Sequence, residues 1–289
     1  MTYVKRLFAL LGLAFLLCGC ASRHKPAQIA ATTAPVYEFT QRLCQGTNLT
    51  VSMLITENVS CLHDYSLSVS QVKAVEGAEL LVLSGAGLEA FMDELLNGKA
   101  TADSSESIHL LGCEHEHDHG DHAHEDADPH IWLSPENAMV MATNICASLC
   151  DRYSQYQDIF ETNLQQLLQD LQVLQAYGKD QLADLPCREL ITFHDGFAYF
   201  AQAFDLTILK AVEEESGSEA SAGELKELCG LVREHQLPAV FTEVFGSTGA
   251  AEILSRETGV PIFQLDMAMS GSYFDAMYHN IDTVKEALG

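Results

Sequence analysis

Short apolar runs of strand length alternate along the chain with longer segments in which apolar residues recur every three or four positions. Runs of the first kind are typical of buried β-strands, and the second spacing is typical of helices with one buried face. In the first third of the chain the pattern predicts strands at residues 28–32, 49–56 and 79–83, and helices at 35–44, 68–76 and 88–96. Strands that alternate with helices predict a parallel sheet covered by helices on both faces.

The same alternation returns near the middle of the chain. It predicts strands at residues 188–193, 206–212, 239–242 and 261–265, and helices at 197–204, 222–235, 247–258 and 273–288. Gly259, directly after the third of these helices, is typical of a helix C-terminus. The chain therefore has two regions of βα pattern, and we expect each region to fold as one lobe.

Two helical segments, at 135–150 and 153–182, separate these regions. The second carries a single apolar stripe, formed by Tyr153, Tyr156, Phe160, Leu164, Leu167, Leu171 and Leu174. A helix of that length measures about 45 Å at about 1.5 Å per residue, which is too long for a crossover within one small domain. We therefore predict an α/β protein with an N-terminal lobe at 28–152, a linking helix at 153–183, a C-terminal lobe at 184–289 and a cleft between the lobes.

The N-terminus is typical of an export signal. Lys5 and Arg6 precede an apolar run at 7–17, which is too short to span a bilayer as a mature helix. The sequence Leu17-Cys18-Gly19-Cys20 resembles a bacterial lipobox. This predicts a signal peptide at 1–19, lipidation of Cys20 and a tether at 20–27, so that the protein is lipid-anchored at the extracytoplasmic face of the cell membrane. A plain secretory peptide cut elsewhere is the alternative.

The charge of the chain narrows its possible partners. The formal net charge of −26 becomes −28 once Lys5 and Arg6 are removed with the signal. A strongly acidic surface argues against nucleic acid and anionic lipid as partners, and it favours cations. The seven cysteines after Cys20 are odd in number and form no CxxC pair. They therefore signal neither a disulfide framework nor a cysteine-based zinc finger.

A histidine-rich segment at 113–128 alternates imidazoles with acidic side chains. It has no apolar face of helical or strand period, so it cannot be buried against a core. Neutral imidazole is a common ligand of zinc, and we expect weak secondary metal binding by His115, His117, His119, His122 and His124. The alternative is a solvated acidic loop. His130 follows in the Pro-flanked sequence Asp128-Pro129-His130, and it is the first candidate for a fixed ligand.

Several motifs, in order along the chain, carry a family resemblance. They are His63-Asp64-Tyr65, Gly87-Leu88-Glu89, Asp128 to Pro135, Thr192 to Phe200, Thr242-Glu243 and Leu265-Asp266. From about residue 29 to its end the chain resembles the cluster A-I solute-binding lipoproteins of ABC importers for zinc and manganese, the family of the high-affinity zinc-uptake protein. The resemblance implies two α/β lobes bridged by a long helix, a metal ion buried between them, and a monomer that delivers the ion to an ABC-type membrane permease.

Carried over position by position, the family's metal ligands fall on His63, His130 and His194, with Asp266 as the fourth. Three imidazoles and one carboxylate suit a tetrahedral Zn2+ site. His194 and Asp266 also follow predicted strands, where ligands of parallel sheets bind. Leu62 departs from the pattern, because some zinc-binding members have an acid beside the first histidine, so water remains an alternative fourth ligand. Glu243 is expected to hold an imidazole proton rather than the ion.

Three other functions remain open. The first is a manganese-preferring importer protein of the same family; its manganese members generally present a carboxylate where this chain has His194, which favours Zn2+ over Mn2+. The second is a metallohydrolase, which would need an open coordination position and a general base, for which Glu243 is a loose candidate. The third is a surface adhesin or metal buffer that uses the histidine-rich segment. We expect a zinc-binding transport protein and no enzyme.

Overall fold

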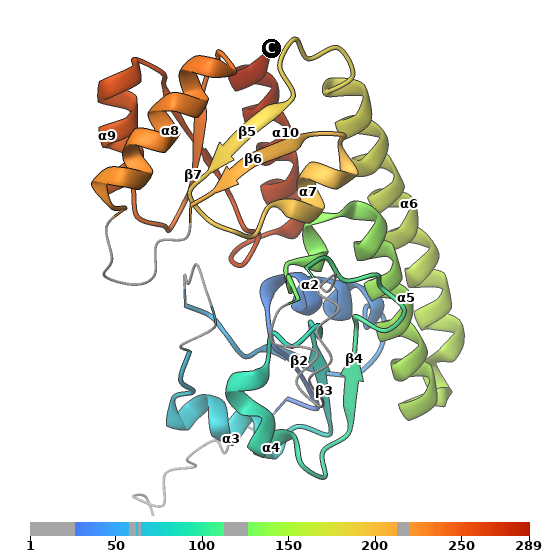
Figure 1. The fold of residues 1–289 in the computed structure, drawn as a ribbon. Helices are drawn as coiled ribbons and strands as arrows, with labels where there is room; N and C mark the ends of the chain where they lie inside the picture. The colour runs from blue at the N-terminus through green and yellow to red at the C-terminus, as the bar shows by residue number, and fades with distance from the viewer. Residues whose placement is uncertain (1–26, 58–61, 63–64, 113–126, 213–219) are drawn as a thin grey trace, which may run out of the picture.

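The computed structural model describes residues 27–57, 62, 65–112, 127–212 and 220–289 (Figure 1). The predicted signal peptide, Cys20, His63 and the five imidazoles of the histidine-rich segment lie outside these ranges. Within the described part of the chain, no helix is both long and apolar enough to cross a membrane.

The first sheet has four parallel strands in the order β2-β1-β3-β4. Its strands are β1 (Ile29–Ala31), β2 (Val51–Met53), β3 (Leu80–Leu83) and β4 (Thr101–Asp103). The helical elements of this lobe are α2 (Ala34–Leu43), α3 (Val69–Gly77), η1 (Ala90–Met92), α4 (Asp93–Leu96), η2 (Ile131–Leu133) and α5 (Pro135–Arg152). Local sequence signals explain where two of these helices, α3 and α5, begin. Ser68 and Gln71 form a capping box at α3, and Pro135 occupies the first turn of α5.

Two details of this lobe differ from the sequence pattern. The predicted continuous helix at 88–96 is wrong, because Met92, with a φ of −129°, separates the 3-10 turn η1 from the single turn of α4. The strand β4 was not predicted. It is three residues long and only Ala102 within it is buried, so it is too short to show a period of two.

The second sheet is also parallel, in the order β6-β5-β7-β8. Its strands are β5 (Glu189–Thr192), β6 (Thr207–Ala211), β7 (Val240–Glu243) and β8 (Ile262–Leu265), and its helices are α7 (Ala198–Ala203), α8 (Ala222–Glu234), α9 (Gly249–Thr258) and α10 (Tyr273–Leu288). As predicted, Gly259 ends α9 with a left-handed φ of 82°. The carboxyl ends of β5, β7 and β8 lead directly to His194, Glu243 and Asp266.

The helix α6 (Gln157–Gln181) packs against α2 and α5 at one end and against α10 at the other. Figure 1 shows it running along the side of both lobes. At about 1.5 Å per residue its 25 residues measure about 38 Å. The predicted single helix from residue 153 is therefore too long. Tyr153 leaves the helical region, and the 3-10 turn η3 (Ser154–Tyr156) precedes α6. The lobe boundaries on either side of this helix stay a prediction.

The two lobes share one hydrophobic core. A single buried cluster extends from Ile29 in the first sheet through Trp132 to Tyr199 and Tyr273 of the second lobe. Hydrogen bonds also cross between the lobes: the buried Tyr273 hydroxyl donates to the Trp132 carbonyl at 2.9 Å, and the Tyr273 backbone N–H donates to the partly buried Glu38 Oε2 at 2.7 Å. The side chains at this junction therefore have fixed partners in the opposite lobe.

Candidate metal centre

His130 lies in the N-terminal lobe at the start of η2, where Asp128 holds it by two contacts. Asp128 Oδ1 accepts the His130 backbone N–H at 2.9 Å and lies 2.8 Å from the ring atom Nδ1. This arrangement assigns the ring proton to Nδ1 and leaves the Nε2 lone pair for an ion. His130 is 6% exposed, so a ligand bound to Nε2 would be largely shielded from solvent.

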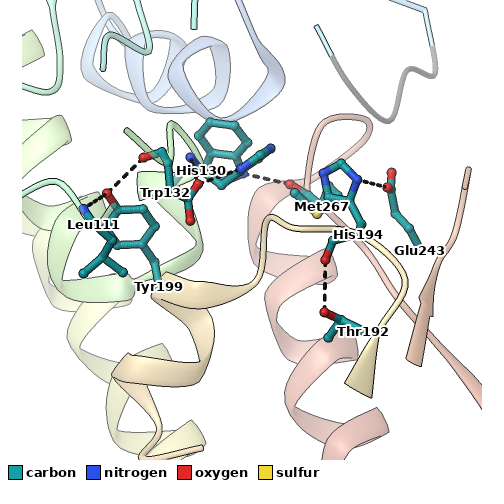
Figure 2. Close-up of polar contacts among 9 residues, drawn as sticks. Leu111, His130, Trp132, Thr192, His194, Tyr199, Glu243 and Met267 are labelled. Carbon is teal, nitrogen blue, oxygen red and sulfur yellow. Dashed lines mark hydrogen bonds and ion pairs between the residues drawn. The ribbon is translucent and has the colours of Figure 1, made fainter. Parts of the chain in front are cut away.

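His194 lies two residues beyond the end of β5. Its backbone carbonyl accepts a hydrogen bond from Thr192 Oγ1 at 3.0 Å, and its Nδ1 lies 3.5 Å from Glu243 Oε2 (Figure 2). Gly196 leaves room for the ring, because a Cβ there would lie 2.8 Å from His194 Cδ2 and 2.5 Å from Met267 Cε. The close packing of the His194 imidazole therefore favours glycine at position 196.

His130 and His194 come from different lobes and face each other. Their ring centroids are 5.3 Å apart with an interplanar angle of 83°, and Figure 2 shows both side chains beside Met267. Two imidazoles that share one tetrahedral zinc ion, with Zn–N bonds of about 2.0–2.1 Å, have ring centroids about 5 Å apart. The observed separation therefore fits a single zinc ion between the two rings.

Glu243, at the end of β7, is a buried acid with a raised pKa. It is 2% exposed, and burial, followed by the nearby charge of Asp266, raises its pKa to about 7. Among the described residues neither of its oxygens has a hydrogen-bond partner, although Oε2 faces His194 Nδ1. Two carboxylates so placed create a negative potential at the interlobe site, which a bound cation would offset.

Asp266, which follows β8, is held by α10. Asn280 is fully buried; its side chain accepts the Asp266 backbone N–H and donates to the Asp266 carbonyl, both at 2.7 Å. Asp266 Oδ1 accepts the N–H of Ala268 at 2.8 Å. These contacts fix the main chain on both sides of the carboxylate and occupy one of its oxygens. They leave Oδ2 as the oxygen better suited to an ion.

The structure thus brings His130, His194 and Glu243 together. Across the described ranges, no group of three or more His, Cys, Asp or Glu side chains has a geometry that would hold a metal ion. The third imidazole of the expected set, His63, lies outside those ranges. The four-ligand set of His63, His130, His194 and Asp266 stays a prediction.

Two features of the site were missed in the sequence. Asp128 belongs to a recognised motif, and its position two residues before His130 is typical of an acid that turns back on its own backbone. That spacing would have identified it as the partner of His130. The second feature is Trp132, whose indole N–H donates to the Met267 carbonyl of the other lobe at 2.8 Å. No local signal marks that contact, because 135 residues separate the two positions.

The protein has two lobes, each built on a parallel β-sheet, and two imidazoles from different lobes face each other. This arrangement defines a two-lobed binding protein with a candidate metal centre. Residues 29–287 match the family model described as zinc-uptake complex component A, periplasmic, and the chain belongs to this family. The family resemblance predicted from the motifs is confirmed.

Individual relatives agree with this assignment. The zinc-binding lipoprotein AdcA of Streptococcus pneumoniae is 28% identical over 94% of this chain, which spans 58% of the length of AdcA. The manganese ABC transporter substrate-binding lipoprotein PsaA of Streptococcus mitis is 25% identical over 98% of this chain and 97% of its own. A crystal structure of ZnuA superposes with a TM-score of 0.81 at 30% identity, covering 91% of this chain and 100% of that chain. This structural match confirms the predicted α/β fold class.

Proposed function

We propose that this protein captures Zn2+ between its two lobes outside the cytoplasm and delivers it to an ABC-type permease. One observation carries the proposal: His130 and His194 come from opposite lobes, and their ring centroids, 5.3 Å apart, fit one shared zinc ion. Membership of the zinc-uptake family supports the same cargo. The ion is the transported substrate, and the chain's own contribution is to select, bind and shield it.

The expected ligands are His63, His130, His194 and Asp266. Support for a ligand at position 63 comes from its neighbour. Leu62 is 3% exposed and lines a cavity of about 610 Å³ together with Pro129, which directly precedes His130. The residues next to two expected ligands thus line one cavity. Asp266 supplies a carboxylate as the fourth ligand, and Glu243 or water is the alternative at that position.

Each described part of the site has a defined role in holding the ion. Asp128 and Glu243 lie at the Nδ1 atoms of His130 and His194, so both imidazoles present Nε2 to the ion as stronger bases. The negative charge of Glu243 and Asp266 offsets part of the ion's charge in a site screened from water. Acid weakens binding, because zinc competes with protons for the imidazoles.

The chain's attachment and its secondary binding sites belong to the same proposal. Lipidation of Cys20 would hold the domain at the extracytoplasmic face of the membrane, near the permease. The five imidazoles between His115 and His124 would bind further zinc ions weakly, because bringing several of these side chains around one ion has a cost in conformational entropy.

A manganese cargo is the second candidate. The observation that favours it is the buried Glu243 carboxylate beside His194, since Mn2+ prefers oxygen-rich sites. PsaA, a relative named for manganese, is also similar over almost the whole chain. The imidazole at position 194 favours zinc, because affinity at a nitrogen-rich site rises from manganese to zinc.

A zinc titration of the metal-free protein tests the proposed function. Trp132 is the single tryptophan of the chain, and its ring centroid lies 5.4 Å from that of His130, so its fluorescence is a natural reporter of binding. We expect one tight zinc ion per chain, and loss of most of that affinity in His130→Ala and in His194→Ala. Wild-type tight binding that survives both substitutions would refute the interlobe site.

A further inference from the structure

The indole of Trp132 joins the two segments that carry expected ligands in different lobes. Its N–H donates to the Met267 carbonyl at 2.8 Å, and Met267 is the residue after Asp266 (Figure 2). Trp132 itself lies two residues after His130, and its ring meets the His130 imidazole edge to face at 5.4 Å between centroids. One side chain therefore contacts one expected ligand and holds the main chain beside another.

Both ends of this connection are firmly held. On the Met267 side, Asn280 brackets the main chain of Asp266 with two hydrogen bonds of 2.7 Å. On the Trp132 side, Asp128 Oδ1 accepts the His130 backbone N–H at 2.9 Å and lies 2.8 Å from the His130 ring atom Nδ1. Each segment is thus held within its own lobe, and the indole hydrogen bond joins the two directly.

The bond is also shielded from water. Trp132 and Tyr273 have no exposed surface, and Met267 is 2% exposed. If the indole N–H were removed, the Met267 carbonyl would lose a partner that water could replace only by entering the core. A shift of the Met267 main chain would then be the easier response, and it would carry Asp266 with it.

We propose that Trp132 is a positioning residue that fixes the separation of His130 and Asp266 and so sets the rate at which the bound ion leaves. This inference rests on the proposed zinc site. The indole hydrogen bond to Met267 acts on the ion through the main chain of Met267 and Asp266. We therefore expect it to affect retention of the ion more than its capture.

The test compares two variants that each lose one buried hydrogen bond between the lobes. Trp132→Phe removes the indole N–H that reaches Met267, while Tyr273→Phe removes the hydroxyl that reaches the Trp132 carbonyl and leaves Met267 untouched. Zinc release into excess chelator, thermal unfolding of the metal-free proteins, and the visible spectrum of the Co2+-loaded proteins are measured for both.

We expect Trp132→Phe to release zinc about fivefold to tenfold faster than wild type, the effect of one buried hydrogen bond. The Co2+ spectrum of this variant should change, because ligand geometry determines it, while Tyr273→Phe keeps the wild-type spectrum and release rate. Equal acceleration in both variants, or a wild-type rate and spectrum in Trp132→Phe, would overturn the positioning role.

A second substitution removes the same donor with less change in shape. Because the chain has one tryptophan, growth on benzothienylalanine replaces this indole alone with a ring of similar shape that lacks the N–H. The substituted protein should release zinc as fast as Trp132→Phe. Wild-type release from it would contradict the inference while leaving the zinc site intact. If the unmodified protein bound no tight zinc, the proposed function would itself fail.

Discussion

Asp128→Asn tests how Asp128 prepares His130, an expected ligand, for metal binding. In the wild type one carboxylate oxygen accepts two contacts, the His130 backbone N–H at 2.9 Å and the ring Nδ1 at 2.8 Å. Asparagine keeps an oxygen that can accept both, so the fold of the segment should survive. What changes is the charge beside the ring atom Nδ1, and with it the basicity of Nε2, the atom expected to bind the ion.

The expected size of the effect follows from these contacts. A hydrogen bond to an ionised acceptor is about twice as strong as a neutral one, whose net value is about 1 kcal/mol. The substitution also removes a negative charge near a doubly charged ion. Together these changes weaken zinc binding by about 1.5–3 kcal/mol, which is about 10-fold to 100-fold, the usual range for such partners of metal-binding histidines.

Competition with a chromophoric zinc chelator measures this loss, and thermal unfolding of the metal-free protein shows whether the fold is intact. Asp282→Asn is a matched control, because it removes an equal charge and keeps an oxygen that can accept the Tyr177 hydroxyl, a contact of 2.6 Å between α6 and α10. Wild-type zinc affinity in Asp128→Asn would refute the reasoning, as would an equal loss in the control.

Three further predictions concern other parts of the chain. Cys20→Ala should abolish lipid labelling and release the protein from membranes; unchanged membrane retention would contradict the anchor. Deletion of residues 114–125 should lower the total number of bound zinc ions and spare the tight one, as equilibrium dialysis would show; loss of the tight ion would place a primary ligand in that segment. Burial raises the pKa of Glu89 to about 7. The folded state therefore keeps a proton that the unfolded state loses, and stability should fall as pH rises from about 4.5 to about 7. The free energy of unfolding should lose that slope in Glu89→Gln, and an unchanged slope would exclude Glu89 as its source.

Periodicity predicted the elements that bury one continuous face. The last helix, α10, begins and ends at the predicted residues, and Gly259 ends α9 as expected. Periodicity failed where an element was too short to have a repeat, as in β4, or where one backbone angle interrupts an apolar stripe, as at Tyr153 before α6. Local spacing contains no information about either case.

The residues of the site also differ in how far the sequence could predict them. His130, His194 and Glu243 were singled out from their motifs and their places at strand ends, and the structure brings them together. The contact from Trp132 to Met267 depends on how two distant segments pack, so the one-dimensional pattern could not reveal it. The role of His63 stays a prediction from the motif around it.

Direct competition between zinc and manganese for the metal-free wild-type protein tests whether the interlobe site selects zinc. Equimolar ions are dialysed to equilibrium against the protein, and the metal bound per chain is measured, with His194→Ala in parallel. We expect zinc to occupy the tight site of the wild type and His194→Ala to lose most of it, because the proposed three imidazoles and one carboxylate favour zinc. Preferential retention of manganese by the wild type, or tight zinc in His194→Ala, would contradict the proposed zinc site.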